Sequence, residues 1–455
     1  MDLHVIVLAA GKGSRMKSSK PKVLHQLAGK PMLEHVLETA VSLSPKAIHV
    51  VIGHEAQQIQ EYFEGYPNEI NWVTQAEQLG TGHAVAQVSS FLETGSKVII
   101  LYGDVPLIAL PSLQELSELA DAQTLALLTV EMEDPTGYGR IVRNPAQEVV
   151  AIVEQKDATQ DQLQIQEVNT GFMALSSDNL INWLPKLSSN NAQGEYYLTD
   201  LVALAVEDGK EVEACFPEGL EEVQGVNDRL QLCELECWYQ SQRGEELLRN
   251  GVTLYDPNRI DIRGNLSVGQ DVVIDINCIF LGEVKIGDGV HIGPNCVIKD
   301  SQIASGTVIN AHSLLEDSIV GEHCNIGPFA RLRPGSKLDT AAKVGNFVET
   351  KKAHIGEGSK INHLSYIGDA IVGEDVNVGA GTITCNYDGV NKYQTVLGDG
   401  VFIGSNSSLV APVNIQDQAT IGAGSVITKD VEAKQLAVAR GRQTNISNWK
   451  KPEKQ

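Results

Sequence analysis

A glycine-rich loop near the start of the chain has the residue types that hold phosphate groups. Residues 11–16, Gly-Lys-Gly-Ser-Arg-Met, follow an apolar run, and Pro21-Lys22 comes shortly after them. Small residues at the end of a strand let backbone N–H groups approach phosphate oxygens, and nearby cations supply charge. The loop lacks the third glycine of the dinucleotide fingerprint and the Gly-Lys-Ser/Thr of a P-loop, so taken alone it is equally typical of a tight turn.

Two further side chains could do chemistry. Asp104 ends a second apolar run in Tyr102-Gly103-Asp104, where a carboxylate can hold Mg²⁺ against phosphates or simply cap the turn before Pro106. His363 follows an aliphatic position of a regular repeat, so its side chain is expected at the surface of the repeat. Imidazole is the side chain best suited to take up a proton near neutral pH.

Apolar runs and amphipathic stretches alternate up to about residue 225. We expect buried strands over 5–8, 48–52 and 98–101, and helices over 31–40, 55–63 and 82–92. This alternation predicts a doubly wound, Rossmann-like α/β domain with a mainly parallel sheet. Ligands in such sheets bind beyond the carboxyl ends of the strands, which is where the glycine-rich loop and Asp104 fall.

A single long helix is expected to follow this domain. Asp228 can cap its start, and Gly251 can end it. We expect its apolar face to consist of Leu230, Cys233, Cys237 and Trp238.

From Val268 onward an aliphatic residue recurs every six positions, often followed by glycine. The first two runs are Val268, Ile274, Phe280, Ile286, Ile292 and Ile298, then Val308, Leu314, Val320, Ile326, Leu332, Leu338 and Val344. A period of six fits neither a helix nor simple alternation, and it predicts a triangular β-helix with one hexapeptide on each face. The six-residue period is interrupted between Ile383 and Leu397. A loop that protrudes from a rigid solenoid is often functional.

Composition narrows the classes of function. The 455 residues include 35 Lys plus Arg against 58 Asp plus Glu, so a net charge of −23 argues against nucleic acid and anionic membrane surfaces as partners. The seven cysteines contain no Cys-x-x-Cys pair and are expected to be reduced and mostly buried. Neither a membrane-spanning run nor a basic leader is visible, so we expect a cytoplasmic protein.

Taken together, the motifs resemble those of a known family. They are the loop at 11–16 with Pro21-Lys22, Gln75-Ala76-Glu77-Gln78-Leu79-Gly80-Thr81, Tyr102-Gly103-Asp104, Gly137-Tyr138-Gly139-Arg140 and Asn169-Thr170-Gly171. Joined to the hexapeptide repeat, the chain is similar along essentially its whole length to the bacterial bifunctional N-acetylglucosamine-1-phosphate uridylyltransferases and glucosamine-1-phosphate N-acetyltransferases. One small departure is Ser14, where the family commonly has threonine.

The resemblance implies three regions: a uridylyltransferase domain over 1–227, a linker helix over 228–250, and a left-handed β-helix acetyltransferase domain with a basic tail over 251–455. It implies that Arg15 and Lys22 act on the triphosphate and that Asp104 and Asn227 bind Mg²⁺. The remaining substrate-binding residues that it implies are Leu8, Ala9, Ala10, Gly11, Gln75, Gly80, Thr81, Tyr102, Gly103, Gly139, Glu154 and Asn169.

In the second domain the resemblance implies that His363 is the general base of acetyl transfer. Arg333, Lys351, Tyr366 and Asn377 are implied to bind the amino-sugar phosphate, and Ala380, Asn386, Tyr387, Ser405, Ala423 and Arg440 to bind acetyl-CoA. The tail cations Arg440, Arg442, Lys450, Lys451 and Lys454 suit the CoA phosphates, or they are a solubilising end. The products are UDP-N-acetylglucosamine and pyrophosphate, and the family's prisms associate as homotrimers.

Three other interpretations stay open. The chain could be a single-activity sugar-phosphate nucleotidyltransferase with a structural or regulatory β-helix, or a scaffold with decayed sites. The complete set of His363, Asn386-Tyr387 and Arg440 speaks against the first, and the retained Arg15, Lys22, Asp104 and Asn227 speak against the second. A zinc site between neighbouring prisms, built from His291, His312, His323 or His354, is disfavoured because these residues lack the His-x-x-x-x-His pattern of β-helical carbonic anhydrases.

Overall fold

Buried aliphatic strands form the central sheet of the N-terminal part of the chain. In this computed structural model, which describes residues 2–53 and 56–452, the strand order is β11-β7-β10-β6-β1-β4-β5. The strands are β1 (Leu3–Ala9), β4 (Ala47–Ile52), β5 (Asn71–Thr74), β6 (Lys97–Tyr102), β7 (Thr124–Glu131), β8 (Arg140–Arg143), β9 (Val149–Val153), β10 (Glu167–Ser176) and β11 (Glu211–Cys215). The predicted parallel strands β1, β4 and β6 are confirmed, while β10 runs antiparallel to β6 and β7.

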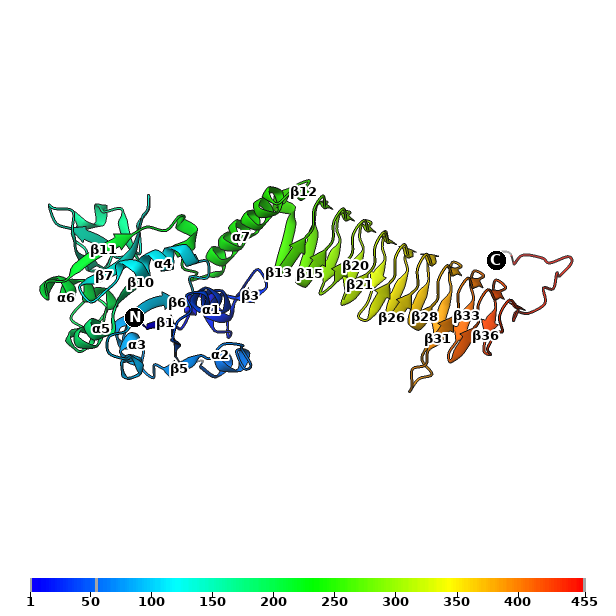
Figure 1. Cartoon of the computed structure of the whole chain (residues 1–455), viewed down its shortest axis with the longest axis horizontal. Helices are drawn as coiled ribbons and strands as arrows, with labels where there is room; N and C mark the ends of the chain where they lie inside the picture. The colour runs from blue at the N-terminus through cyan, green and yellow to red at the C-terminus, as the bar shows by residue number, and fades with distance from the viewer. Residues whose placement is uncertain (1, 54–55, 453–455) are drawn as a thin grey trace. The chain divides into compact units, whose positions relative to one another are not determined.

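Helices connect these strands (Figure 1). They are α1 (Met32–Ser42), α2 (Ala56–Tyr62), α3 (Thr81–Ala86), α4 (Leu110–Leu119), α5 (Ser177–Trp183) and α6 (Leu201–Glu207). Residue 55, where we expected the second helix to begin, lies outside the described residues. The helix expected over 82–92 is wrong in its second half, because the Ser89 hydroxyl donates to the Ala86 carbonyl (2.7 Å) and a separate turn follows over Ser89–Phe91.

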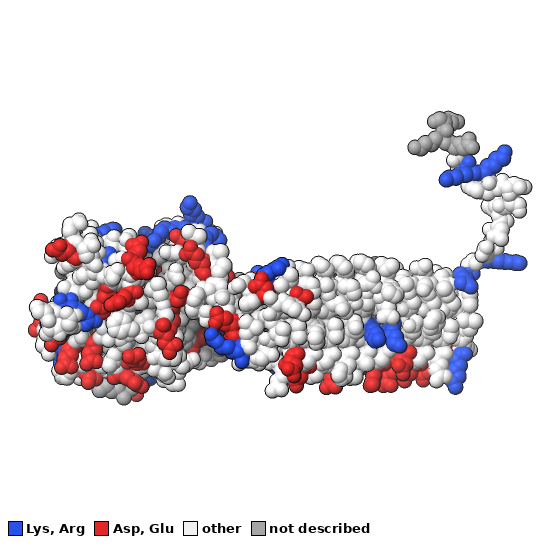
Figure 2. Space-filling view, turned by 90° about the horizontal axis from the view of Figure 1, so that it is seen from above, with Lys and Arg blue, Asp and Glu red and all other residues white. Residues whose placement is uncertain are grey.

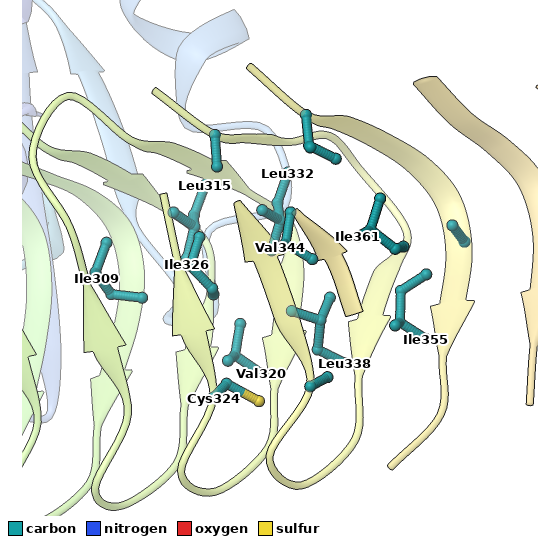
Figure 3. Packing of buried hydrophobic residues seen from close by; sticks show 14 of the residues in the cluster. Ile309, Leu315, Val320, Cys324, Ile326, Leu332, Leu338, Val344, Ile355 and Ile361 are labelled. Carbon is teal, nitrogen blue, oxygen red and sulfur yellow. The ribbon is translucent and has the colours of Figure 1, made fainter. Parts of the chain in front are cut away.

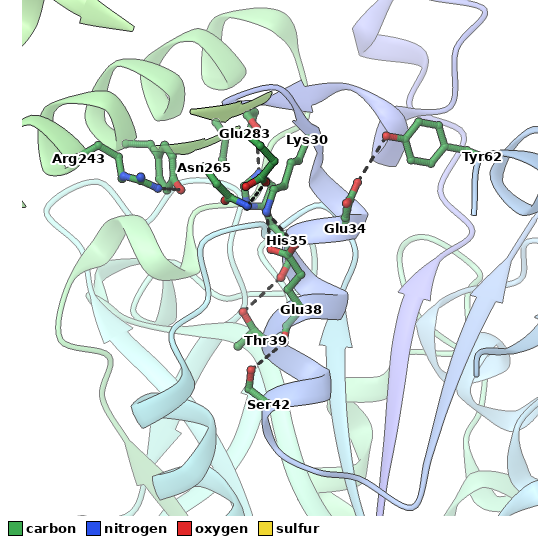
Figure 4. A network of polar contacts seen from close by, with 12 residues as sticks. Lys30, Glu34, His35, Glu38, Thr39, Ser42, Tyr62, Arg243, Asn265 and Glu283 are labelled. Carbon is green, nitrogen blue, oxygen red and sulfur yellow. Dashed lines mark hydrogen bonds and ion pairs between the residues drawn. The ribbon is translucent and has the colours of Figure 1, made fainter. Parts of the chain in front are cut away.

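Helix α1 is held by its apolar face and not by its outer polar contacts. Leu33, Val36 and Leu37 are fully buried. On the outer side, Lys30 Nζ donates to Glu38 Oε1 (2.8 Å) and the Tyr62 hydroxyl donates to Glu34 Oε2 (3.5 Å; Figure 4). Exposed pairs of this kind contribute about 0–1 kcal/mol, so burial of the apolar face stabilises α1.

A buried histidine pair lies on β1 and β4. The rings of His4 and His49 stack with centroids 5.4 Å apart, and His4 Nδ1 lies 3.1 Å from His49 Nε2. Within the described part of the chain, neither His4 Nε2 nor His49 Nδ1 has a hydrogen-bond partner. Burial, reinforced by the neighbouring His4, lowers the pKa of His49 to about 4.

This pair predicts acid-sensitive stability of the N-terminal part of the chain. Because the pKa of His49 is lower in the folded than in the unfolded state, stability is full above about pH 6.5 and falls as the pH drops toward 4. The loss is at most about 3 kcal/mol, from roughly 1.4 kcal/mol per pKa unit. We expect His49→Leu to flatten this dependence in calorimetry between pH 7 and 4, and an equally steep curve for the variant would contradict the assignment.

Helix α7 (Arg229–Arg249) follows the sheet. Asp228 caps it as predicted, since its Oδ1 accepts from the N–H groups of Leu230 (2.9 Å) and Gln231 (3.0 Å). The expected apolar face is wrong: Leu230, Cys233 and Cys237 are exposed. Leu235 is buried instead and packs with Leu27, Met32 and Val226, because the helix turns this other stripe to the core. Leu247, near the end of the helix, is also buried.

The second part of the chain is a stack of short parallel strands. The chain divides into two compact units, Met1–Cys237 and Trp238–Gln455, which we call the N-terminal and C-terminal units. One face of the stack consists of β12 (Thr253–Leu254), β14 (Val273–Ile274), β16 (His291–Ile292), β19 (Val308–Ile309), β22 (Asn325–Ile326), β25 (Lys343–Asn346), β27 (Lys360–His363), β29 (Asn377–Val378), β32 (Phe402–Ile403), β35 (Thr420–Ile421) and β37 (Leu436–Ala437). The predicted β-helix is confirmed; the domain limits at 227 and 250 stay a prediction.

Aliphatic side chains fill the interior of the β-helix (Figure 3). Ile274 pairs with Ile292 and Ile292 with Ile309, so these two coils take 18 and 17 residues. The six-residue frame is wrong at Val308 and Leu314, which are half-buried, while Ile309 and Leu315 point inward. A side of five residues between the buried Ile298 and Ile303 shifts the frame by one.

The glycines of the repeat lie where successive coils touch. A Cβ atom at Gly293 would come within 2.9 Å of the backbone nitrogen of Ala311 on the next coil. Only glycine allows that approach.

Of the seven free cysteines, Cys215, Cys278, Cys296 and Cys324 are buried, as expected for most of them. Across the described residues, we find no helix with both the length and the apolar character that a membrane crossing requires.

Candidate active sites

A cavity of about 240 Å³ opens at the carboxyl ends of β1 and β6. Ten of the predicted substrate-binding residues line it: Leu8, Ala9, Ala10, Gly11, Lys22, Gln75, Gly80, Thr81, Tyr102 and Asp104. Val23, Ala84 and Glu195, which the sequence did not single out, also line it, as does Gln78 of the 75–81 motif. The parallel strands end at one edge of the sheet, and this explains how loops far apart in sequence meet here.

Lys22, Asp104 and Asn227 form one polar cluster at this cavity. Lys22 Nζ forms an ion pair with Asp104 Oδ2 and donates to Asn227 Oδ1 (3.3 Å). The side chains of Lys22 and Asp104 are 12% and 19% exposed, so the pair is well shielded from solvent. The cluster thus joins two carbonyl-type oxygen ligands and one cation at the place where a nucleotide phosphate is expected.

A second group of predicted residues gathers around Glu154. The Asn169 N–H donates to the Gly139 carbonyl (2.9 Å), and the Thr199 hydroxyl donates to Glu154 Oε1 (3.1 Å). Burial raises the pKa of Glu154. Burial also raises the pKa of Tyr102, and the charges of Glu154 and Asp104 add to this effect, so Tyr102 connects this group to the Lys22 cluster.

Besides Asn227 and the group around Glu154, two further predicted residues of the N-terminal unit are absent from the cavity lining. Arg15 is exposed on the turn Ser14–Met16 and is absent from the residues that line the cavity. Gly103 lies between Tyr102 and Asp104, and its N–H donates to the Leu8 carbonyl (2.9 Å), which ties β6 to β1. The structure therefore leaves the role of Arg15 as a prediction.

Gly80 provides a test of the cavity wall. Its φ is 113°, and a Cβ atom there would lie 2.6 Å from the backbone oxygen of Tyr196 and 2.8 Å from its nitrogen. We expect Gly80→Ala to move the 75–81 loop, to raise the KM for the nucleotide expected in this cavity several-fold, and to destabilise the N-terminal unit by about 1–3 kcal/mol. Gly65→Ala is the control, because Gly65 also has positive φ (81°) but no atom within 4 Å of the added Cβ. Equal effects of the two substitutions on KM would contradict a role for Gly80 in the site.

In the C-terminal unit, predicted residues fall at equivalent positions of successive coils. Backbone N–H groups of Gly381, Asn406 and Gly424 donate to the carbonyls of His363 (3.4 Å), Ala380 (2.7 Å) and Ser405 (2.8 Å), respectively. His363, Ala380 and Ser405 are therefore neighbours along one corner of the prism, and we call them the His363 row. Ala423 lies beside them, because the next residue, Gly424, is the one that bonds to Ser405. The Ala423 carbonyl accepts from Arg440 Nη1 (2.7 Å).

Cations gather beside this row. Arg333 follows β23 (Arg331–Leu332) and donates to Glu349 Oε1 (2.8 Å), whereas Lys351 lies in β26 (Glu349–Ile355). The positive charges of Lys392 and Arg333 lower the pKa of Lys351. Lys351 therefore lies close enough to both cations to be repelled by them, and an anionic phosphate would relieve that repulsion. Tyr366 begins β28 (Tyr366–Val372) and pairs in register with Glu349, and Asn377 begins β29.

The irregular loop predicted after β30 (Ile383–Cys385) leaves the stack of coils beside β31 (Thr395–Leu397; Figure 1). Its base is closed by the Tyr393 N–H, which donates to the Asn386 carbonyl (2.9 Å), and the Asn386 amide donates to Asp369. Tyr387 is exposed on it. The inward residue of β30 is Thr384, which is buried, while Ile383, the last aliphatic residue before the break in the period, is exposed.

Sequence reasoning missed Lys392 and Glu349. Lys392 lies in the very loop where the six-residue period breaks, so that signal could have identified it. Glu349 gave no signal, since its pairing with Arg333 depends on the register of neighbouring coils. Among the described residues no group of three or more His, Cys, Asp or Glu side chains could hold a metal ion. Lys454 of the predicted basic tail lies outside the described residues.

A nucleotide-type cavity on an α/β sheet, followed by a hexapeptide β-helix with its own polar row, defines a two-domain transferase. Comparison with known families agrees: residues 5–165 match the MobA-like NTP transferase domain, and 394–429 match bacterial transferase hexapeptide repeats. Residues 262–339 match the GMPPB C-terminal domain.

Curated proteins named bifunctional protein GlmU resemble the chain from end to end. The protein from Marinobacter nauticus is 61% identical over 452 residues, covering 99% of both chains. That from Pseudomonas entomophila is 57% identical over 454 residues, covering 100% of this chain and 99% of the relative. The chain belongs to the bifunctional GlmU family, and it is an enzyme with a nucleotidyltransferase and a hexapeptide acetyltransferase domain.

Proposed function

We propose that the chain makes UDP-N-acetylglucosamine in two steps. The C-terminal unit transfers an acetyl group from acetyl-CoA to glucosamine 1-phosphate, and the N-terminal unit then joins the product to the uridylyl group of UTP. The observation that carries this proposal is that each compact unit holds its own set of polar residues, the Lys22 cluster in one and the His363 row in the other.

In uridylyl transfer, an oxygen of the sugar 1-phosphate attacks the α-phosphorus of UTP and pyrophosphate leaves. Backbone N–H groups at 8–11 and the Lys22 ammonium neutralise the phosphates, Gln75 and Thr81 contact uracil, and Glu154 and Asn169 hold the amino sugar. Such catalysis works by positioning and charge neutralisation and needs no side-chain nucleophile.

Asp104 and Asn227 fit a divalent cation, and we propose Mg²⁺. Both offer oxygen donors, and Lys22 Nζ already lies against both, so their oxygens converge on one point. Mg²⁺ usually takes one or two protein ligands together with phosphate oxygens and water. When bound, the ion supplies positive charge to the developing pyrophosphate.

In acetyl transfer, the amine of glucosamine 1-phosphate gives a proton to His363 and attacks the thioester carbonyl. The carbonyl oxygen becomes an oxyanion, which we assign to the backbone N–H of Ala380, and the CoA thiolate leaves and takes up a proton. Arg333, Lys351 and Lys392 hold the sugar phosphate, and Tyr366 and Asn377 the sugar. Ser405, Ala423 and Arg440, with Asn386 and Tyr387 of the loop, hold acetyl-CoA.

The purified chain tests both steps with glucosamine 1-phosphate, acetyl-CoA, UTP and Mg²⁺. We expect thiol release that needs no UTP, and pyrophosphate release driven by N-acetylglucosamine 1-phosphate alone. Pyrophosphate without thiol would leave a nucleotidyltransferase with a structural β-helix. Absence of both products would favour a scaffold.

We further propose a cytoplasmic homotrimer. At one corner of the prism, His312, Phe329 and Phe347 stack with centroids 4.7 and 5.3 Å apart, at φ of 60°, 56° and 57°. Equivalent corners on other coils carry Asn277, Asn295 and Asn406, which suit positive φ far better. Bulky residues cost about 1–2 kcal/mol there, and both phenylalanines are about half exposed, so contact with a second copy of the chain would offset the strain.

The trimer gives a direct prediction. We expect the double variant Phe329→Asn, Phe347→Asn to lose about two thirds of its solution mass in light scattering while keeping uridylyl transfer, because asparagine favours this backbone conformation. Ile319→Asn is the control, since Ile319 is equally exposed but lies on β21 (Ser318–Val320) of another face. An unchanged mass of the double variant would exclude this corner from the interface.

Figure 2 shows few charges on the visible face of the β-helix, whereas acidic residues crowd the N-terminal unit, so the binding of substrate anions depends on local cations.

A further inference from the structure

Asn346 extends the row of polar positions by one coil toward the N-terminus. It ends β25 and pairs in register with His363 of β27. Its carbonyl accepts from the Leu364 N–H (3.1 Å), in the same way that the His363 carbonyl accepts from Gly381. Asn346, His363 and Ala380 therefore occupy one corner position on three successive coils.

The side chains of Asn346 and His363 are in contact. Asn346 Oδ1 lies 2.8 Å from His363 Nδ1. An amide oxygen only accepts hydrogen bonds, so the proton of the neutral imidazole must lie on Nδ1. Nε2 then carries the lone pair that can take a proton from an amine.

The main chain around His363 is fixed as well. The Ser365 hydroxyl donates to the His363 carbonyl (2.8 Å), and Ser365 is buried. The His363 carbonyl is thus held by Ser365 of its own coil and by the Gly381 N–H of the coil that follows, and the ring is held by Asn346 of the coil that precedes. A neutral amide achieves this without adding a charge beside the imidazole.

We propose that Asn346 is a positioning residue that keeps His363 in its Nδ1-protonated tautomer for acetyl transfer. This inference rests on the proposed function, because it assumes that His363 is the general base. Orienting partners of catalytic imidazoles typically matter by 10-fold or more. Asn346 itself touches His363 and is not assigned to the substrate.

Two substitutions separate orientation from packing. Asn346→Leu has nearly the same shape but no acceptor, and we expect it to lower the kcat of acetyl transfer by about 10- to 100-fold with little change in either KM. Asn346→Asp retains an acceptor for the Nδ1 proton, and we expect it to keep most of the activity. Circular dichroism and the calorimetric unfolding transitions of the same full-length variants report whether the β-helix is folded, since uridylyl transfer belongs to the other unit.

A spectroscopic readout tests the tautomer directly. In protein labelled with ¹⁵N-histidine, the signals lost in His363→Gln identify His363, and we expect the wild type to show a protonated Nδ1 and an unprotonated Nε2. The Asn346→Leu variant should shift this signal toward the other tautomer. A protonated Nε2 in the wild type, or full kcat in Asn346→Leu, would overturn the inference. Full acetyl transfer by His363→Ala would instead overturn the proposed role of His363, so the two failures are distinguishable.

Discussion

Replacing His363 by alanine is expected to lower the kcat of acetyl transfer by about 10²- to 10⁴-fold, the range typical of losing a general base. The amine of an amino sugar is largely protonated near neutral pH and attacks only after it loses a proton. His363 ends β27 with an exposed side chain, one coil before Ala380, so the proposed base and the proposed oxyanion donor lie on adjacent coils of one corner. Alanine leaves the coil intact because the position is outside the core.

The measurement is thiol release from acetyl-CoA in the absence of UTP, with pyrophosphate release as the internal control. Uridylyl transfer should stay within twofold of the wild type, because the two reactions use residues of different units. His354→Ala is a matched control: His354 is an exposed histidine of the same β-helix, on β26, paired with Asp339 (2.7 Å). If both histidine variants lost acetyl transfer equally, the effect would be structural and His363 would have no special role.

The fold could be predicted because its signals are local. An aliphatic residue every six positions fixes the β-helix whatever the distant parts of the chain do, and the apolar runs of β1, β4 and β6 fix a parallel sheet in the same way. The candidate cavity followed from a general rule, since loops at the carboxyl ends of parallel strands must meet. Lys22 and Asp104 are far apart in sequence, yet the rule brought them together.

The errors arise where an outcome depends on register or on tertiary packing. Val308 and Leu314 obey the six-residue count, but one five-residue side shifts the inward positions to Ile309 and Leu315. Helix α7 buries Leu235 because Leu27 and Met32 lie opposite it, which its own sequence does not reveal. Asn346 escaped notice for the same reason, since only the pairing of β25 with β27 places it against His363.

Replacing Asp104 by asparagine is expected to lower uridylyl transfer by about 10²- to 10³-fold, the size of losing one electrostatic contact in a site that excludes water. Asp104 supplies the only formal negative charge in its cluster with Lys22 and Asn227. Asparagine keeps the shape and one oxygen donor, but it removes the charge that attracts a divalent cation. The Lys22 ammonium also loses its ion-pair partner and is left beside amides.

Titration of the divalent cation distinguishes these two consequences. If Asp104 acts as a metal ligand, the concentration of Mg²⁺ that gives half-maximal activity should rise in the variant, and high Mg²⁺ should restore part of the rate. If Asp104 only positions Lys22, the rate should stay low at every metal concentration. Glu38→Gln is the control, because Glu38 also pairs with a lysine, Lys30 (2.8 Å), but it lies on the outer side of α1. Acetyl transfer should be unchanged in both variants, and a variant that lost both activities would show that Asp104 supports folding and not chemistry.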